Sequence, residues 1–242
     1  MVRRLTRSHA RRHHDCAQRG CCKENAVKRR SRASLPQDVR GVALLEFALF
    51  APLLLAMILS GFELGNYALA NNRVQRLASM TADLVAQSGT GVVGATEAQI
   101  YDLFSAIDLT AQPFNLRRHG RVVITAVKGT DYDNNGIIEN RILWQRFDGD
   151  FTSASPVLGC NLVSSLATLP NSRMLPLDEI LFHVQVTYEY QPIFSIYPMN
   201  LMKLEPSFTR MAMFRARNKD FQTPTPDQRF PAKKNCNTPT GL

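Results

Sequence analysis

The chain has 242 residues and a formal net charge of +9, and its sequence pI of about 9.6 would by itself suggest a nucleic-acid-binding protein. The charge is distributed unevenly, since residues 1–41 contain 12 Lys or Arg and 3 acidic residues, whereas residues 42–242 contain 17 of each kind. The basic character therefore belongs to an N-terminal leader, and nucleic acid is excluded as the expected partner of the rest of the chain.

An apolar run follows the leader from Gly41 to Phe62 and contains a single charged residue, Glu46. About 20 helical residues, at a rise of 1.5 Å each, cross a bilayer core of roughly 30 Å. The run is therefore predicted to be a transmembrane helix. A carboxylate in such a helix costs about 2.5 to 3.5 kcal/mol at mid-membrane, so an intramembrane Glu is by default a functional residue with a partner.

Proteolysis after Gly41 would supply that partner. Val42 would become the new N-terminus, and an α-amino group with a pKa of about 7.7 to 8.0 is cationic at neutral pH. Glu46 lies four residues further on. It can meet the amino group across one helical turn, or neutralise the amino group of an identical neighbouring helix.

These residues resemble the signature of a known family. Gly41, four apolar residues, Glu46, Phe47 and a long apolar run resemble the cleavage and assembly segment of type IV prepilins, whose peptidase cuts after the Gly. With Pro52 inside the run, the segment is similar to the TadE-like pseudopilins of the tight-adherence (Flp) pilus system. The resemblance implies that Gly41 permits cleavage and that Val42, Glu46 and Phe47 set the register of assembly. Pro52 is expected to bend the helix, because it removes a backbone donor.

The charge bias also predicts orientation. An excess of Lys and Arg holds the leader in the cytoplasm, so the chain is expected to cross the bacterial inner membrane once and to place its C-terminal part in the periplasm. The resemblance implies a structural role without enzymatic activity or cofactor, either in the fibre or in priming it. The implied partners are the prepilin peptidase, other pilins or pseudopilins, inner-membrane pilus assembly proteins and the lipid bilayer.

Two other interpretations of the apolar run stay open. A secretory signal peptide has a shorter apolar core followed by a small-x-small cleavage site, and no such site follows this run. The second alternative is an uncleaved single-span envelope protein whose periplasmic head binds a partner or ligand.

The predicted fold class is α+β, with a long N-terminal transmembrane and amphipathic helix followed by a small, pilin-like head built on an antiparallel sheet. Six segments are expected: a basic cytoplasmic leader over 1–41, a transmembrane helix over 42–65, an amphipathic helical extension over 66–87, a Gly-rich linker over 88–95, the α+β periplasmic head over 96–219 and a Pro-rich tail over 220–242.

Helical periodicity continues beyond the span. Apolar and small side chains recur every three or four residues up to about residue 87, with Glu63 placed off that stripe. The spacing of Thr96 and Gln99 predicts a capping box, and a short helix should run from Glu97 to about residue 109. The expected buried stripe of the long helix is Leu64, Tyr67, Asn71, Val74, Ala78, Thr81 and Val85.

From residue 121 onward the periodicity becomes that of strands. Residues 122–127 and 137–147 are predicted to form a hairpin, with Ile142 and Trp144 on one face and residues 131–136 as its turn. Residues 180–190 alternate strictly, which predicts a strand with one buried face and with His183 on the opposite, solvated face. A last strand is expected over residues 207–217.

A second block of resemblance lies in these strands. The hairpin with its Trp144, the alternating Val184–Pro192 segment and the later Met211–Arg217 segment resemble the C-terminal half of TadE-like proteins. The likeness covers residues 41 to about 218 loosely. The related TadF- and TadG-type subtypes remain alternatives.

Cysteine placement fits the predicted crossing. Three cysteines lie in the leader, and the exported part contains the even pair Cys160 and Cys236, which we expect to form a disulfide, with two free thiols as the alternative. This disulfide would fix the Pro-rich tail to the head.

A metal site has little support from the sequence. Two leader histidines at i, i+4 spacing near a cysteine match zinc ligands only in spacing. Asp131, Asp133 and Asn135, followed by Gly136, match the opening of a calcium loop, but Ile142 occupies the twelfth place, where a bidentate Glu is expected. A polar hairpin tip is the preferred interpretation, and a weak calcium site is the alternative.

Overall fold

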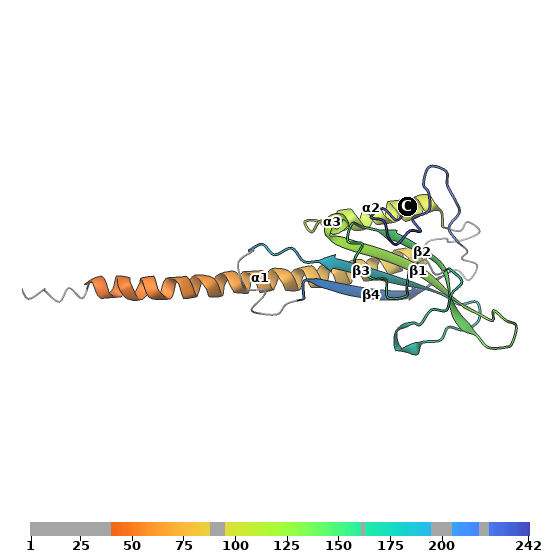
Figure 1. Cartoon of the computed structure of the whole chain (residues 1–242), viewed down its shortest axis with the longest axis horizontal. Helices are drawn as coiled ribbons and strands as arrows, with labels where there is room; N and C mark the ends of the chain where they lie inside the picture. The colour runs from red at the N-terminus through yellow and green to blue at the C-terminus, as the bar shows by residue number, and fades with distance from the viewer. Residues whose placement is uncertain (1–39, 88–94, 161–162, 195–204, 218–222) are drawn as a thin grey trace, which may run out of the picture. The chain divides into compact units, whose positions relative to one another are not determined.

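In the computed structural model, the described residues are 40–87, 95–160, 163–194, 205–217 and 223–242 (Figure 1). Residues 1–39 of the basic leader, with the two histidines considered as zinc ligands and the three cysteines, lie outside them, as does most of the Gly-rich linker. The chain divides into two compact units, Met1–Leu49 and Phe50–Leu242. The described part of the first unit is the beginning of helix α1, and the second unit contains the remainder of α1 together with the head.

Helix α1 extends over Arg40–Gln87 and is assigned as one helix through Pro52. Its buried face begins at Glu63 and includes Ala70, Val74 and Leu77. The predicted stripe is therefore correct at Val74, and also at the later positions Ala78, Thr81 and Val85. It is wrong at the start, because Leu64 is 46% exposed and Glu63 is fully buried.

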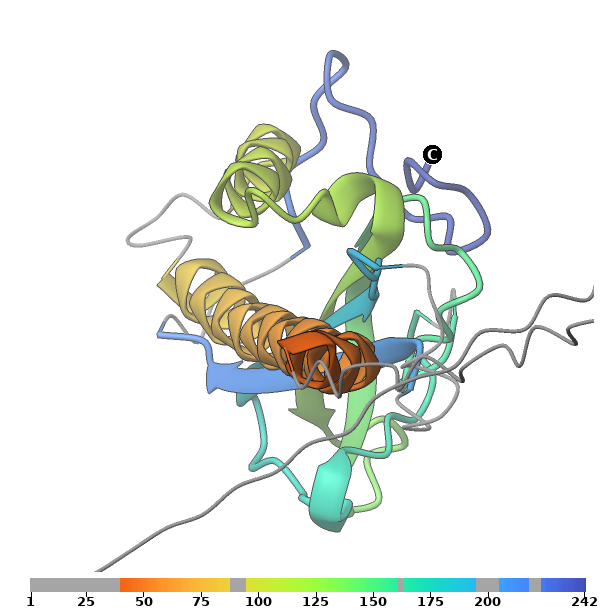
Figure 2. The same cartoon turned by 90° about the vertical axis from the view of Figure 1, so that its left-hand side faces the viewer.

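Two shorter helices follow α1. The capping box predicted at the start of α2 (Glu97–Thr110) is present, because Thr96 accepts a hydrogen bond from the Gln99 amide and the Gln99 side chain accepts one from the Thr96 amide. Helix α3 (Leu116–His119) is one turn long and leads into the sheet. The core shared by these helices and α1 contains Ile100, Phe104 and Ile107, and Figure 2, which looks nearly along α1, shows α1 and α2 next to the sheet.

Four antiparallel strands form the sheet in the order β2-β1-β3-β4. Their bounds are Gly120–Thr130 for β1, Glu139–Asp148 for β2, Ile180–Glu189 for β3 and Ser207–Arg215 for β4. A single 3-10 turn, η1 (Pro170–Ser172), lies in the connection between β2 and β3. The long helix followed by this sheet confirms the predicted α+β class.

A bulge in β2 separates two residues that were predicted to share a face. Ile142 pairs with Val127 and Trp144 pairs with Ala126, so Leu143 is the extra residue between them. Since one extra residue reverses the alternation of side chains, Trp144 enters the core under α1 while Ile142 enters a second core on the other side of the sheet. The prediction that they share a face was wrong for this reason.

The second face of the sheet is also covered. The connection between β2 and β3 contributes Leu158, Leu169 and Leu175 to a core with Leu181 of β3. His183 lies on this face and is 1% exposed, so the expectation that it faces solvent was wrong. Alternation identified the two faces of β3, but it did not reveal that the connection between β2 and β3 folds over the second face.

Candidate functional site

The N-terminal part of α1 is an exposed apolar surface. Twelve large apolar side chains between Val42 and Phe62 are each at least 51% exposed. Water-soluble proteins rarely leave a contiguous apolar surface of this kind uncovered. Within the described residues, α1 is the one helix that is long and apolar enough to cross a membrane.

The five residues singled out for processing and assembly all lie on α1. Glu46, Phe47 and Pro52 are exposed, and Glu46 makes no hydrogen bond or ion pair with the described residues around it. A Cβ atom added to Gly41 would meet no atom within 4 Å, and the same holds at Gly61. Packing against the described residues therefore explains neither the carboxylate of Glu46 nor the glycine at position 41.

A second acidic residue of α1, Glu63, is fully buried at the end of β3. Its Oε1 atom accepts hydrogen bonds from the Tyr190 hydroxyl at 2.7 Å and from the Ile193 amide at 3.2 Å, and its Oε2 atom accepts one from the Phe194 amide at 3.3 Å. The Asn66 side chain donates to the Tyr190 hydroxyl at 2.8 Å. We call Glu63, Asn66, Tyr190, Ile193 and Phe194 the Glu63 junction.

Aromatic side chains surround the junction. The Tyr67 ring packs edge-on against Tyr190, with centroids 5.1 Å apart, and against Phe208 of β4 at 5.5 Å. Burial, followed by the hydrogen bond to Glu63, raises the pKa of Tyr190 to about 12. The hydroxyl therefore remains protonated at physiological pH and keeps donating to the carboxylate.

Sequence reasoning placed Glu63 off the apolar stripe of the helix. Its position four residues before Tyr67 places it on the same helical face as residues that pack on the sheet. That spacing was the available signal, and assigning the charged residue to the solvated face concealed it.

A buried ion pair joins α2 to β2. The Arg146 guanidinium donates to both oxygens of Glu97, with its Nε atom 3.1 and 3.0 Å from them, and the two side chains are only 4% and 2% exposed. The same guanidinium lies over the Trp144 ring, 5.4 Å from its centroid. Neither member of this pair was identified from the sequence.

The tail from Thr223 onward is packed against the head. The buried Arg121 of β1 donates to the backbone oxygens of Cys236 and Thr238, at 2.8 and 2.7 Å. Lys233 donates to Asp148 at 2.6 Å, with both side chains at most 10% exposed. Polar contacts thus help to attach this Pro-rich segment to the head.

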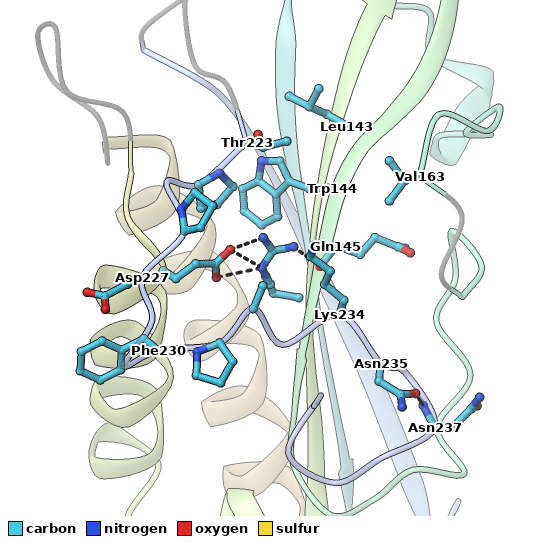
Figure 3. A pocket seen from close by; sticks show the side chains of 16 residues that line it. Leu143, Trp144, Gln145, Val163, Thr223, Asp227, Phe230, Lys234, Asn235 and Asn237 are labelled. Carbon is cyan, nitrogen blue, oxygen red and sulfur yellow. Dashed lines mark hydrogen bonds and ion pairs between the residues drawn. The ribbon is translucent and has the colours of Figure 1, made fainter.

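An open groove of about 950 Å³ lies between the tail and β2 (Figure 3). The Glu97–Arg146 pair lies among its lining residues. Trp144 and Gln145 line it from β2, and Asp227 and Asn235 line it from the tail. The charged groups of the Glu97–Arg146 pair are already satisfied by each other.

Cys160, from the connection between β2 and β3, lies against Cys236 of the tail. Their Cα atoms are 5.9 Å apart and the structure joins them as a disulfide across a separation of 76 residues. Val123 and Phe147 pack beside them.

The residues of the calcium alternative form the hairpin tip. The Asp131 carboxylate accepts hydrogen bonds from the amides of Asn135 and Gly136, at 3.0 and 2.9 Å. The Asn135 side chain in turn accepts one from the Ile137 amide. Across the described ranges, no group of three or more His, Cys, Asp or Glu side chains is placed to hold a metal ion.

Comparison with known proteins identifies the helix rather than the head. No curated protein and no solved structure matches the chain. Residues 41–83 match the family model described as TadE-like protein, and this range covers most of α1 together with Gly41, Glu46 and Glu63. Over its N-terminal helix, the chain is therefore similar to TadE-like proteins.

Proposed function

We propose that this chain is a minor pseudopilin that acts in the assembly of a tight-adherence (Flp-type) pilus. It is made as an inner-membrane precursor with a cytoplasmic leader, cut after Gly41 by a prepilin peptidase, and delivered into the assembly through α1. The head lies in the periplasm, and the role is structural rather than enzymatic.

The observation that carries this proposal is the unpartnered carboxylate of Glu46 on an exposed apolar helix. A lone charge in lipid is unfavourable, and no described residue of the same chain neutralises it. Cleavage after Gly41 would create a cationic group four residues away. The match of residues 41–83 to TadE-like proteins supports this interpretation.

Assembly then follows from the physics of helix association in lipid. Lipid tails are as apolar as leucine, so helices gain by close packing and polar pairing rather than by hydrophobic transfer. The exposed side chains between Val42 and Phe62 supply the packing surface. Glu46 supplies the polar pairing with the amino terminus of Val42, in the same helix or in a neighbour, and so sets the register.

The N-terminus of the membrane-resident protein tests the proposal. Mass spectrometry of protein from cells that contain the prepilin peptidase should show a chain beginning at Val42, and cells without the peptidase should retain the leader. A mature chain that begins elsewhere would refute the pseudopilin assignment. An intact leader in both strains would favour the uncleaved single-span envelope protein.

The assembly role is tested separately by Glu46→Ala. This variant should still insert into the membrane, because the substitution makes the helix more apolar, yet it should fail to support pilus formation. Ser60→Ala is a control that changes another residue of the same helix and keeps the charge of Glu46. Normal piliation of the Glu46→Ala strain would remove the proposed role of the carboxylate.

A further inference from the structure

The outer edge of β4 presents backbone groups that no other described strand uses. The Tyr190 amide donates to the Pro206 oxygen at 2.8 Å, and the Ala216 amide donates to the Ile180 oxygen at 2.8 Å. Even-numbered residues at both ends of β4 therefore bond to β3. Because successive residues of a strand bond to opposite sides, the odd-numbered residues point their N–H and C=O groups outward: Ser207, Thr209, Met211, Met213 and Arg215.

The two edges of the sheet differ in how far other segments of the chain cover them. Along β2, the Ile142 amide donates to Ser165 and the Phe147 amide donates to Lys233, at 3.0 and 2.9 Å, so the chain covers its own edge. Along β4, among the residues that the structure describes, the outward groups receive one contact, from the Arg210 side chain to the Thr209 oxygen at 3.2 Å. Uncovered edge strands are templates for pairing with another chain.

The edge also has apolar side chains beside its free backbone. Met211 and Phe214 are each 39% exposed, and they lie on opposite faces of the strand because their numbers differ in parity. Arg210 directly precedes Met211 in the strand, and it forms no ion pair within the described part of the chain. A strand with apolar residues opposite Met211 and Phe214 and a carboxylate near Arg210 would complement this edge.

Strand β4 runs in the same direction as α1. Phe208, near its start, packs against Tyr67, and Arg217, just after its end, donates through its amide to the Ala86 oxygen at 3.2 Å. In Figure 1, β4 accordingly lies along α1. If α1 rises out of the membrane as the proposed function requires, β4 runs away from the membrane and an antiparallel partner strand runs toward it.

This direction argues against antiparallel pairing with the β4 edge of a second copy of the chain. Antiparallel pairing of two β4 edges relates the copies by a twofold axis perpendicular to the strands, which would point their α1 helices in opposite directions. Two such helices could not enter one membrane from the same side. Strand β2 has the correct direction for pairing with β4 of a neighbouring copy, but its edge is covered by the chain itself.

We therefore propose that the β4 edge binds a strand of a different subunit of the same assembly, and that this strand runs antiparallel to β4, toward the membrane. Pairing with such a strand would extend the sheet while keeping the membrane helices of both subunits parallel. This inference rests on the proposed function, because it uses the membrane orientation of α1.

Proline substitution tests the backbone pairing. Met211→Pro removes an outward N–H and leaves the hydrogen bonds to β3 intact, so the full-length protein should keep its thermal stability in detergent. Ala212→Pro removes a bond to β3 and should unfold the head. Met211→Thr keeps the outward N–H and should behave like the original protein.

The probe is each of the other pseudopilins of the same pilus system, co-expressed singly with the full-length chain and purified from membranes. Residue-resolved hydrogen exchange should show that one of them slows the amides of Thr209, Met211 and Met213 by about tenfold or more, without changing those of Phe208 and Ala212. Met211→Pro should abolish the protection and Met211→Thr should keep it. Equal exchange with and without every pseudopilin would overturn the proposal, as would concentration-dependent protection in the protein alone, which indicates self-pairing.

The mature N-terminus is read from the same samples. A chain that begins at Val42 but shows no protection of β4 defeats only the edge proposal. A chain that keeps its leader contradicts the proposed function, and the edge proposal then loses the membrane orientation on which it rests.

Discussion

Removal of the Glu63 carboxylate should weaken the attachment of α1 to the head. In Glu63→Ala, three donors lose their acceptor, namely the Tyr190 hydroxyl and the amides of Ile193 and Phe194. A buried donor left without a partner costs about 1 to 3 kcal/mol. Because Ile193 is 53% exposed, water can reach part of this site, and we expect a total loss of about 3 to 5 kcal/mol.

Two milder substitutions divide that loss. Glu63→Gln keeps one acceptor oxygen and replaces the other with a donor, so it should lower the free energy of unfolding by about 1 to 2 kcal/mol. Tyr190→Phe removes one donor and should lower it by about 1 kcal/mol. The two effects should not be additive, because both substitutions remove the same hydrogen bond.

The single tryptophan provides the assay. Trp144 is buried in the core that contains α1, so its fluorescence reports denaturant unfolding of the full-length protein in detergent micelles. Asp102→Ala is a matched control, since it removes an exposed carboxylate from α2 and should change the free energy by less than about 0.5 kcal/mol. If Glu63→Ala and Asp102→Ala were equally stable, the Glu63 junction would not hold α1 to the head and the reasoning would be refuted.

Three further predictions concern the head. Burial lowers the pKa of His183 from 6.5 to about 4. Between these two pH values the unfolded chain therefore binds a proton at His183 that the folded chain does not bind. Stability should be complete above about pH 6.5 and should fall by about 3 kcal/mol as the pH drops to 4, and His183→Leu should flatten this slope in denaturant titrations; an unchanged slope would show that His183 is not its source. Arg146→Met leaves the Glu97 carboxylate buried without its partner and should lower the free energy of unfolding by about 3 to 5 kcal/mol. The double variant with Glu97→Leu should recover most of that loss, and failure to recover would mean that packing rather than charge is responsible. Opening the Cys160–Cys236 bridge, by reduction or by the Cys236→Ser variant, should lower stability by at most about 4 to 5 kcal/mol on the chain-entropy model; a reductant-insensitive melting temperature would show that the bridge is absent or without effect.

The sequence determined the features that depend on neighbouring residues. The apolar run and its single Glu46 are local, and so is the basic leader before them. The capping box of Thr96 and Gln99 needs only a spacing of three residues, and the alternation of β3 needs only one strand. These patterns were sufficient to predict an α+β chain with a membrane-spanning helix and a resemblance to TadE-like proteins.

Tertiary structure decided what covers each face of those elements. Periodicity placed His183 on one face of β3, but the side chains that cover this face, such as Leu158, Leu169 and Leu175, come from a connection that has no regular period. The bulge at Leu143, which separates Trp144 from Ile142, is a property of the pairing between β1 and β2.

The buried charges depend on tertiary structure in the same way. Glu63, Arg121 and Arg146 look like surface residues in the sequence, because a charge is normally solvated. Each is buried because its partners come from distant parts of the chain, at the end of β3, in the C-terminal tail and at the start of α2. Local spacing reports which residues share a face, whereas only the folded chain shows whether water or another segment lies against that face.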